Sequence, residues 1–176
     1  MKTSADGKKK WALLTTKPAN GWLDPNADEL NAGLDISCNI LESDINWTAA
    51  DSDRENEKVS CQVGNSEGLG AANYTTALTF IRQFLADPAG GIDVAGTDAG
   101  YQAVRVRGSE VGIYLRESDK FSPEPWAAAD IIELGGRVIS DAPQRVDNVG
   151  SIKRRIPFLP QEMVIEHPVA AGTGGV

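Results

Sequence analysis

Apolar residues recur at every second position in several short stretches of this chain, and this alternation constrains the fold more than any other feature. In a β-strand, successive side chains point to opposite faces, so such spacing places one face in a core and leaves the other for water or an interface. The pattern predicts strands over residues 34–40, 59–63, 74–84, 111–115, 131–140 and 152–158, and residues 163–165 form either a last strand or an arm.

Helical signals are few. Residues 98–107 predict one short helix, because Thr97 or Asp98 can cap it and Gly108 can end it. Asp24 could cap a shorter helical turn that ends near Gly33. About seven or eight strands with one flanking helix favour an antiparallel β-sandwich or barrel over repeated βαβ units.

The 176 residues suit one domain with extended ends. We expect an N-terminal arm and irregular segment over residues 1–33, a β-sandwich or barrel over 34–160, and a C-terminal arm over 161–176. Two adjacent glycines, Gly135 and Gly136, predict a bulge or sharp bend within their strand. No apolar stretch approaches the ~20 residues that span a bilayer, and the N-terminus shows no secretory signal.

The two cysteines, Cys38 and Cys61, occupy apolar positions of alternating stretches. A cysteine at such a position usually behaves as a small buried hydrophobe. A disulfide would require the two strands to be neighbours, and the sequence leaves this open. Buried thiols are favoured, because nothing indicates an oxidising compartment.

The net charge of −8 disfavours tight binding to the phosphates of nucleic acids, which requires a basic face. Residues 153–155 form a basic cluster within a predicted strand. In a chain this acidic, we expect that cluster to pair with acidic loops of a neighbouring copy rather than with nucleic acid.

The sequence carries little catalytic equipment. His167 is the only histidine and lies near the C-terminus without an evident partner. Residues 64–68 match the GxSxG pattern, but a strand follows where a nucleophile elbow needs a helix. Asp51, Asp53 and Glu55 resemble the start of a calcium-binding loop whose later required positions hold other residues. We therefore expect no catalytic residue, no cofactor and no metal site.

Aromatic and apolar side chains in loops and arms are typical of interface anchors, and acidic loops can reach a neighbouring subunit. The candidate contacts for self-assembly are Trp22, Leu23, Asp51, Asp53, Glu55, Glu57, Trp126, Met163 and Ile165. The alternative for each apolar residue is that it folds back on its own domain.

Several segments, in order, resemble the major tail tube proteins of long, non-contractile-tailed bacteriophages. They are residues 28–36, residues 73–80, the helix at 98–107 with the strand at 111–116, and residues 126–130. Each motif is short, and their order and spacing over residues 10–165 carry the resemblance. The glycine-rich loop at 84–97 departs from the charged loop expected in that family.

The resemblance implies a β-sandwich or barrel that assembles into rings, usually hexameric, stacked into a tube. Genomic DNA would pass through the lumen without specific binding. The implied partners are copies of the chain itself and other tail proteins, such as the tape measure, distal tail and terminator proteins. The protein would be made in the host cytoplasm and reside in the virion tail, and the family supplies no catalytic residues.

Three other functions stay open. One is a tail terminator or connector of related β fold. Another is a carbohydrate-binding or adhesion β-sandwich, which would need a concave face with exposed aromatic residues, whereas Trp22, Trp47 and Trp126 lie in unrelated segments. The least favoured is an esterase that uses Ser66.

Overall fold

The computed structural model describes residues 4, 6–56, 60–61, 67–85, 90–93, 96–146 and 149–172. Most described strands form one antiparallel sheet in the order β2-β1-β7-β8-β10-β6-β3, with β9 beside β10. Their bounds are β1 Lys9–Leu14, β2 Leu34–Asp35, β3 Asn46–Ala50, β6 Asn73–Ile81, β7 Glu110–Glu117, β8 Ile131–Ser140, β9 Gln144–Arg145 and β10 Lys153–Pro168. A separate two-stranded ladder joins β4 Arg54–Glu55 to β5 Gly68–Leu69. The helices are α1 Ala27–Ala32 and α2 Ala99–Val104, and 3-10 turns cover Ser37–Asn39 and Glu42–Asp44.

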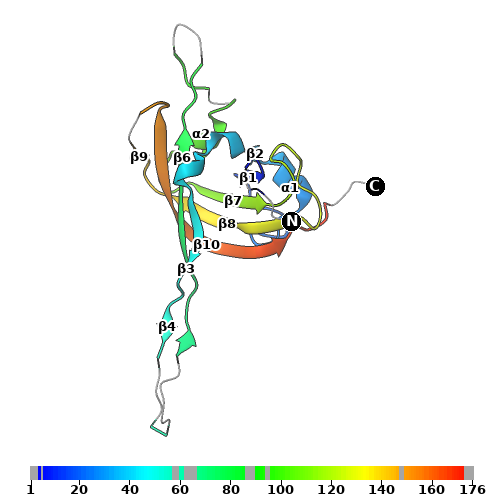
Figure 1. Ribbon diagram of the computed structural model, residues 1–176, viewed down its shortest axis with the longest axis vertical. Helices are drawn as coiled ribbons and strands as arrows, with labels where there is room; N and C mark the ends of the chain where they lie inside the picture. The colour runs from blue at the N-terminus through cyan, green and yellow to red at the C-terminus, as the bar shows by residue number, and fades with distance from the viewer. Residues whose placement is uncertain are drawn as a thin grey trace.

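The long strand β10 curls the sheet around a core (Figure 1). Its first residues, 153–157, pair with β6, whereas residues 158–168 pair with β8. The sheet path ends at β2 and β3, which are not paired with each other. The predicted antiparallel β fold is therefore confirmed as a sandwich-like sheet rather than a closed barrel. Residues 163–165, for which a strand and an arm were both open, belong to β10.

The sheet buries apolar side chains on both of its faces. Along β1, Trp11 and Leu13 join one cluster, whereas Ala12 and Leu14 join the other. Helix α2 adds Tyr101 to the first cluster. A strand that is covered on both faces reads as a continuous apolar run, which explains why β1 shows no alternation in the sequence.

The first helix was expected only as a short turn, and the structure confirms it as α1. Its N-cap is Asn26 rather than Asp24. The Asn26 side chain accepts a hydrogen bond from the Glu29 amide, and the Glu29 carboxylate accepts one from the Asn26 amide, both at 2.9 Å. This reciprocal capping box satisfies two backbone donors that the helix itself cannot pair. The described chain thus has two short α-helices where one was predicted.

The predicted strand over residues 34–40 is wrong after residue 35. The Asp35 carboxylate accepts hydrogen bonds from the Ser37 amide, at 3.0 Å, and from the Ser37 hydroxyl, at 2.6 Å. Such local bonds compete with a strand ladder and favour a turn. Ile36 and Ile40 are buried, but Cys38 between them is exposed.

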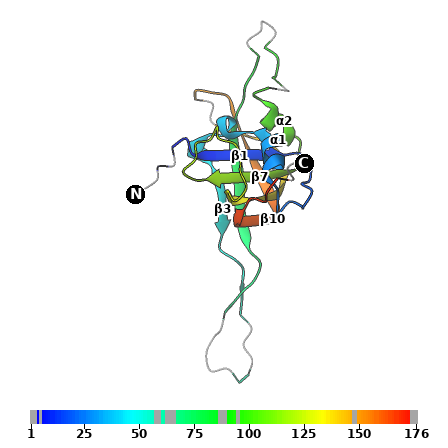
Figure 2. The same ribbon diagram turned by 90° about the vertical axis from the view of Figure 1, so that its right-hand side faces the viewer.

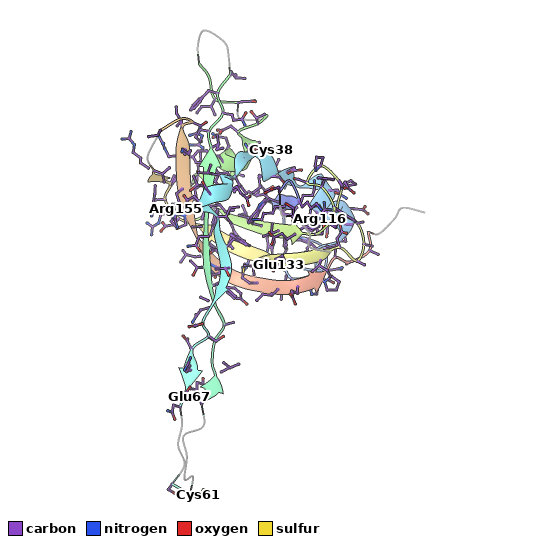
Figure 3. The ribbon with its side chains drawn as sticks, in the orientation of Figure 1. Cys38, Cys61, Glu67, Arg116, Glu133 and Arg155 are labelled. Carbon is purple, nitrogen blue, oxygen red and sulfur yellow. The ribbon has the colours of Figure 1, made fainter. Side chains whose placement is uncertain are left out.

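The expectation of buried thiols is also wrong. Cys38 lies on the body, whereas Cys61 lies on a hairpin far from it, and both are exposed and free (Figure 3). Of the predicted strand at 59–63, the structure describes Ser60 and Cys61, and these two residues form a turn. The other residues of that stretch lie outside the described part of the chain.

A bulge was predicted at Gly135 and Gly136 of β8, but both glycines pair in register, and the register shift lies beside them in the partner strand, between Pro160 and Glu162 of β10. Gly136 has a φ of 146°, and a Cβ there would lie 1.9 Å from the Glu162 carbonyl oxygen. The glycine is therefore required because the two backbones approach too closely for any side chain.

We expect Gly136→Ala to lower the free energy of unfolding by about 2–4 kcal/mol, since it combines a strained φ with a backbone clash. Urea denaturation of the monomer measures this. Gly150→Ala is the matched control, because Gly150 also has positive φ, at 85°, but nothing lies within 4 Å of its Cβ position. Equal losses for the two variants would contradict the importance of the close approach.

Candidate assembly surfaces

A long β-hairpin leaves the body of the molecule at its β3–β6 edge (Figures 1 and 2). Strands β3 and β6 pair from Asn46 opposite Ala77 to Ala50 opposite Asn73, and β4 and β5 continue the hairpin outward. We name the described residues of its outer part, 51–56, 60–61 and 67–72, the hairpin arm. Nearly all of its described side chains are exposed, and Leu69 is 85% exposed. A two-stranded hairpin without a core is marginally stable in water, so contact with a neighbour would stabilise it.

The hairpin arm carries mainly negative charge. Asp51, Asp53 and Glu55 are exposed on it. One ion pair lies within the described part of the arm: it joins Arg54 to Glu67 at 3.2 Å, and both side chains are exposed. Within the described residues, neither Asp51 nor Glu55 has a cationic partner. The acidic loop expected from the sequence is thus part of a protruding hairpin, while Glu57 lies outside the described residues.

A second protrusion, the loop between β6 and α2, points away from the hairpin arm (Figure 1). Phe84 and Ile92 form a β-bridge there, and the Leu85 amide donates to the Gly91 carbonyl oxygen at 2.7 Å. Phe84, Leu85 and Ile92 are 44–45% exposed. This exposed apolar group was not predicted from the sequence, although apolar residues flanking a Pro- and Gly-containing segment are a hairpin signal.

The base of that loop is fixed by the buried carboxylate of Asp98. It accepts hydrogen bonds from Arg82, through Nε at 3.0 Å and Nη2 at 2.9 Å, and from the Gln83 amide at 3.1 Å. The Arg82 guanidinium also lies 3.9 Å from the centre of the Tyr101 ring. A bidentate, charge-assisted contact of this kind is strong and directional. The exposed apolar side chains therefore project from a rigid base.

Arg116 organises the loop between β7 and β8 and is completely buried (Figure 3). Its guanidinium donates to the carbonyl oxygens of Phe121, Glu124 and Pro125 and to the Asp130 carboxylate, at 2.9–3.1 Å. Burial alone would raise the pKa of Asp130, but hydrogen bonds from Lys120, the Ala127 amide and Arg116 outweigh it, so this pKa lies below its usual value. The charge of Arg116 is thus compensated inside the protein.

Two tryptophans proposed as interface anchors are buried in their own domain. Trp126 is 2% exposed and faces the Arg116 guanidinium, 5.4 Å from its ring centre. Trp22 is 5% exposed, and its carbonyl oxygen accepts a hydrogen bond from the Tyr114 hydroxyl at 2.8 Å. Both pack in the second apolar cluster, so the alternative left open for them, that they fold back on their own domain, is the one that the structure shows. Whether they support assembly indirectly stays a prediction.

The other apolar candidates differ in exposure. Leu23 is 42% exposed and Ile165 is 49% exposed, whereas Met163 is half-buried against the first cluster. Ile165 lines a shallow groove with Trp47 and Glu133. Burial raises the pKa of Glu133, and nearby carboxylates add to the effect. The structure therefore leaves Leu23 and Ile165 accessible to another molecule.

The described residues offer little for chemistry. His167 is half-exposed, with its Nε2 atom 3.3 Å from Asp24 Oδ1. Ser66 lies outside the described residues. No three His, Cys, Asp or Glu side chains within the described ranges are placed to hold a metal ion. In the same ranges, no helix is both long and apolar enough to cross a membrane.

Comparison with known proteins gives one family. The family model for "Phage tail tube protein" matches residues 1–173 of the chain. The comparisons with curated proteins and with solved structures give no match.

Proposed function

Because this chain belongs to the phage tail tube protein family, we propose that it polymerises into the tube of a bacteriophage tail. It is a structural component of the virion tail by family. In this proposal, copies close into rings of six, the number that the family resemblance implies, the rings stack, and the lumen conducts DNA during delivery. Its partners would be copies of itself and the proteins at the two ends of the tube.

The observation that carries this proposal is the hairpin arm. A protruding hairpin has no core to stabilise it, and its exposed backbone and side chains are suited to contact with another subunit. The β6–α2 loop offers a second, apolar protrusion on the opposite side (Figure 2). Two different contact surfaces on opposite sides favour assemblies that continue along an axis.

An acidic conduit suits the passage of DNA. The chain has a net charge of −8, and negative walls repel phosphates instead of holding them. Fixed cationic contacts would slow the movement of DNA, since each neutralised phosphate adds to the affinity. The proposed function therefore needs protein–protein contacts and no catalytic residue.

The alternatives are less well supported. A tail terminator or connector would stop at one ring, whereas the two opposite protrusions favour continued stacking. A carbohydrate-binding surface would need a concave face with exposed aromatic residues; all four tryptophans are at most 7% exposed, and the exposed Phe84 and Phe121 lie in two different loops. The tail tube function is consequently the one we retain.

Alanine at Asp51, Asp53, Glu55 and Glu57 together should raise the concentration needed for tube formation about tenfold. The reason is that four charges that face a neighbouring subunit would be lost together. Sedimentation of polymers followed by negative-stain microscopy measures the effect. Alanine at Asp6, Asp119 and Glu124, exposed acids elsewhere, is the control. Equal effects in the two variants, or unchanged tube yield in the first, would contradict the placement of the arm at an interface.

A further inference from the structure

Two arginines face each other on the surface ladder between β9 and β10. Arg145 lies directly opposite Arg154, so their side chains emerge on the same face. Arg145 is exposed and Arg154 is half-exposed. Among the described residues, neither is recorded in an ion pair with an acid. Like charges directly opposite one another destabilise a sheet, so this arrangement gains if an anion lies against it.

Further positive charge lies next to this ladder. The Asp141 amide donates to the Pro157 carbonyl oxygen at 2.9 Å, which holds the segment after β8 against β10. Arg107, which is 81% exposed, contacts Asp141 at 3.2 Å, and Arg105 nearby in the chain is also exposed. We name Arg105, Arg107, Arg145 and Arg154 the basic surface. Asp141 offsets one of its four positive charges, so the surface is basic on an acidic protein.

The basic surface and the hairpin arm lie at different ends of the molecule. In Figure 1, β9 and the start of β10 lie beside the end of β6 that points away from the arm. Figure 3 shows Arg155, at the start of β10, on the body, and Glu67 far out on the arm. The arm of one copy therefore cannot reach its own basic surface.

We propose that the basic surface is the docking site for the acidic hairpin arm of a second copy of this chain. The inference rests on the proposed function and names the contact that would carry polymerisation. Charge complementarity selects the occupant. Within the part of the chain that the structure describes, Asp51 and Glu55 on the arm have no cationic partner, and Arg145 and Arg154 on the basic surface have no acidic one. Complementary charges of this kind mainly set orientation and the rate of association.

The separation of the two surfaces determines what they build. A contact between different patches is heterologous, so each added copy leaves one arm and one basic surface free for the next. Such contacts do not form a two-fold dimer; they close into a ring or continue along an axis, and the placement of the two surfaces at different ends favours continuation. The same surface could attract nucleic acid, but the net charge of −8 opposes that occupant.

Charge reversal tests the proposal. Arg145→Glu with Arg154→Glu keeps a like-charge pair across the ladder, so the monomer should melt as the wild type does. Its polymerisation at low salt should fall about tenfold, because attraction becomes repulsion. Asp51→Lys with Glu55→Lys should have a similar effect. All four changes in one chain restore both the complementarity and the net charge of −8, and should restore polymerisation.

Three results would overturn this inference. The first is normal polymerisation of the Arg145/Arg154 variant, and the second is a fourfold variant that does not regain polymerisation. The third is a DNA duplex that binds the wild type through these arginines while their reversal leaves polymerisation unaffected. A wild-type protein that forms no polymer would instead remove the proposed function itself. The two failures are thereby distinguishable, with melting temperatures of all variants as the check on folding.

Discussion

A variant in which Asn-Gly replaces residues 52–71 is expected to fold but to form no tubes. The replacement joins Asp51 to Ala72, which continue the β3–β6 register, and Asn-Gly suits a two-residue hairpin turn. The body should keep its stability, because the removed side chains that the structure describes are nearly all exposed, and none of these belongs to either apolar cluster. Polymer yield should fall by at least about a hundredfold, since a whole contact surface is lost.

Circular dichroism and thermal melting establish that the shortened variant is folded, and negative-stain microscopy with sedimentation measures its assembly. Deletion within the β6–α2 loop would not be an equivalent control, because that loop is also a candidate contact. Substituting Leu69 by Ser is a better one, since it keeps the arm and its charge. Tubes of normal yield from the shortened variant would show that the arm is dispensable.

The largest loss of monomer stability is expected for Arg116→Met. This change removes the buried guanidinium that donates to Asp130 and to three carbonyl oxygens, while the apolar stem of the side chain is largely kept. Asp130 keeps Lys120 and the Ala127 amide as partners. Removing one member of a buried ion pair typically costs about 3–5 kcal/mol. The free energy of unfolding, from urea denaturation at a concentration that keeps the protein monomeric, measures the loss.

Arg107→Met is the matched control for Arg116, because its ion pair with Asp141 is exposed and should contribute less than about 1 kcal/mol. Arg116→Lys should recover only part of the stability, since an ammonium group cannot reproduce the planar set of donors. A loss for Arg116→Met no larger than that for Arg107→Met would contradict the organising role of Arg116.

The sequence predicted the fold class well where strands alternate or where local signals are strong. Strands β6, β7 and β8 follow the apolar spacing, and the helix at residues 98–107 is confirmed in part as α2. Strand β1 was missed as a strand because both of its faces are buried, which removes the alternation. Residues 36–40 were wrong because the Asp35 side chain favours a turn over a ladder.

The candidate contacts were less predictable, because exposure depends on tertiary packing. Trp126 lies in a loop rich in proline, yet Arg116 draws that loop onto the sheet and buries the ring. Cys38 alternates with apolar neighbours, yet a turn exposes it. The facing pair of Arg145 and Arg154 could not be read from the sequence, since it depends on the β9–β10 register.

Negative-stain microscopy of the purified full chain at increasing concentration shows whether this chain alone builds a tube. We expect hollow tubes of uniform diameter that lengthen with concentration and show stacked rings. Monomers alone, or single rings that never stack at the highest soluble concentration, would contradict it.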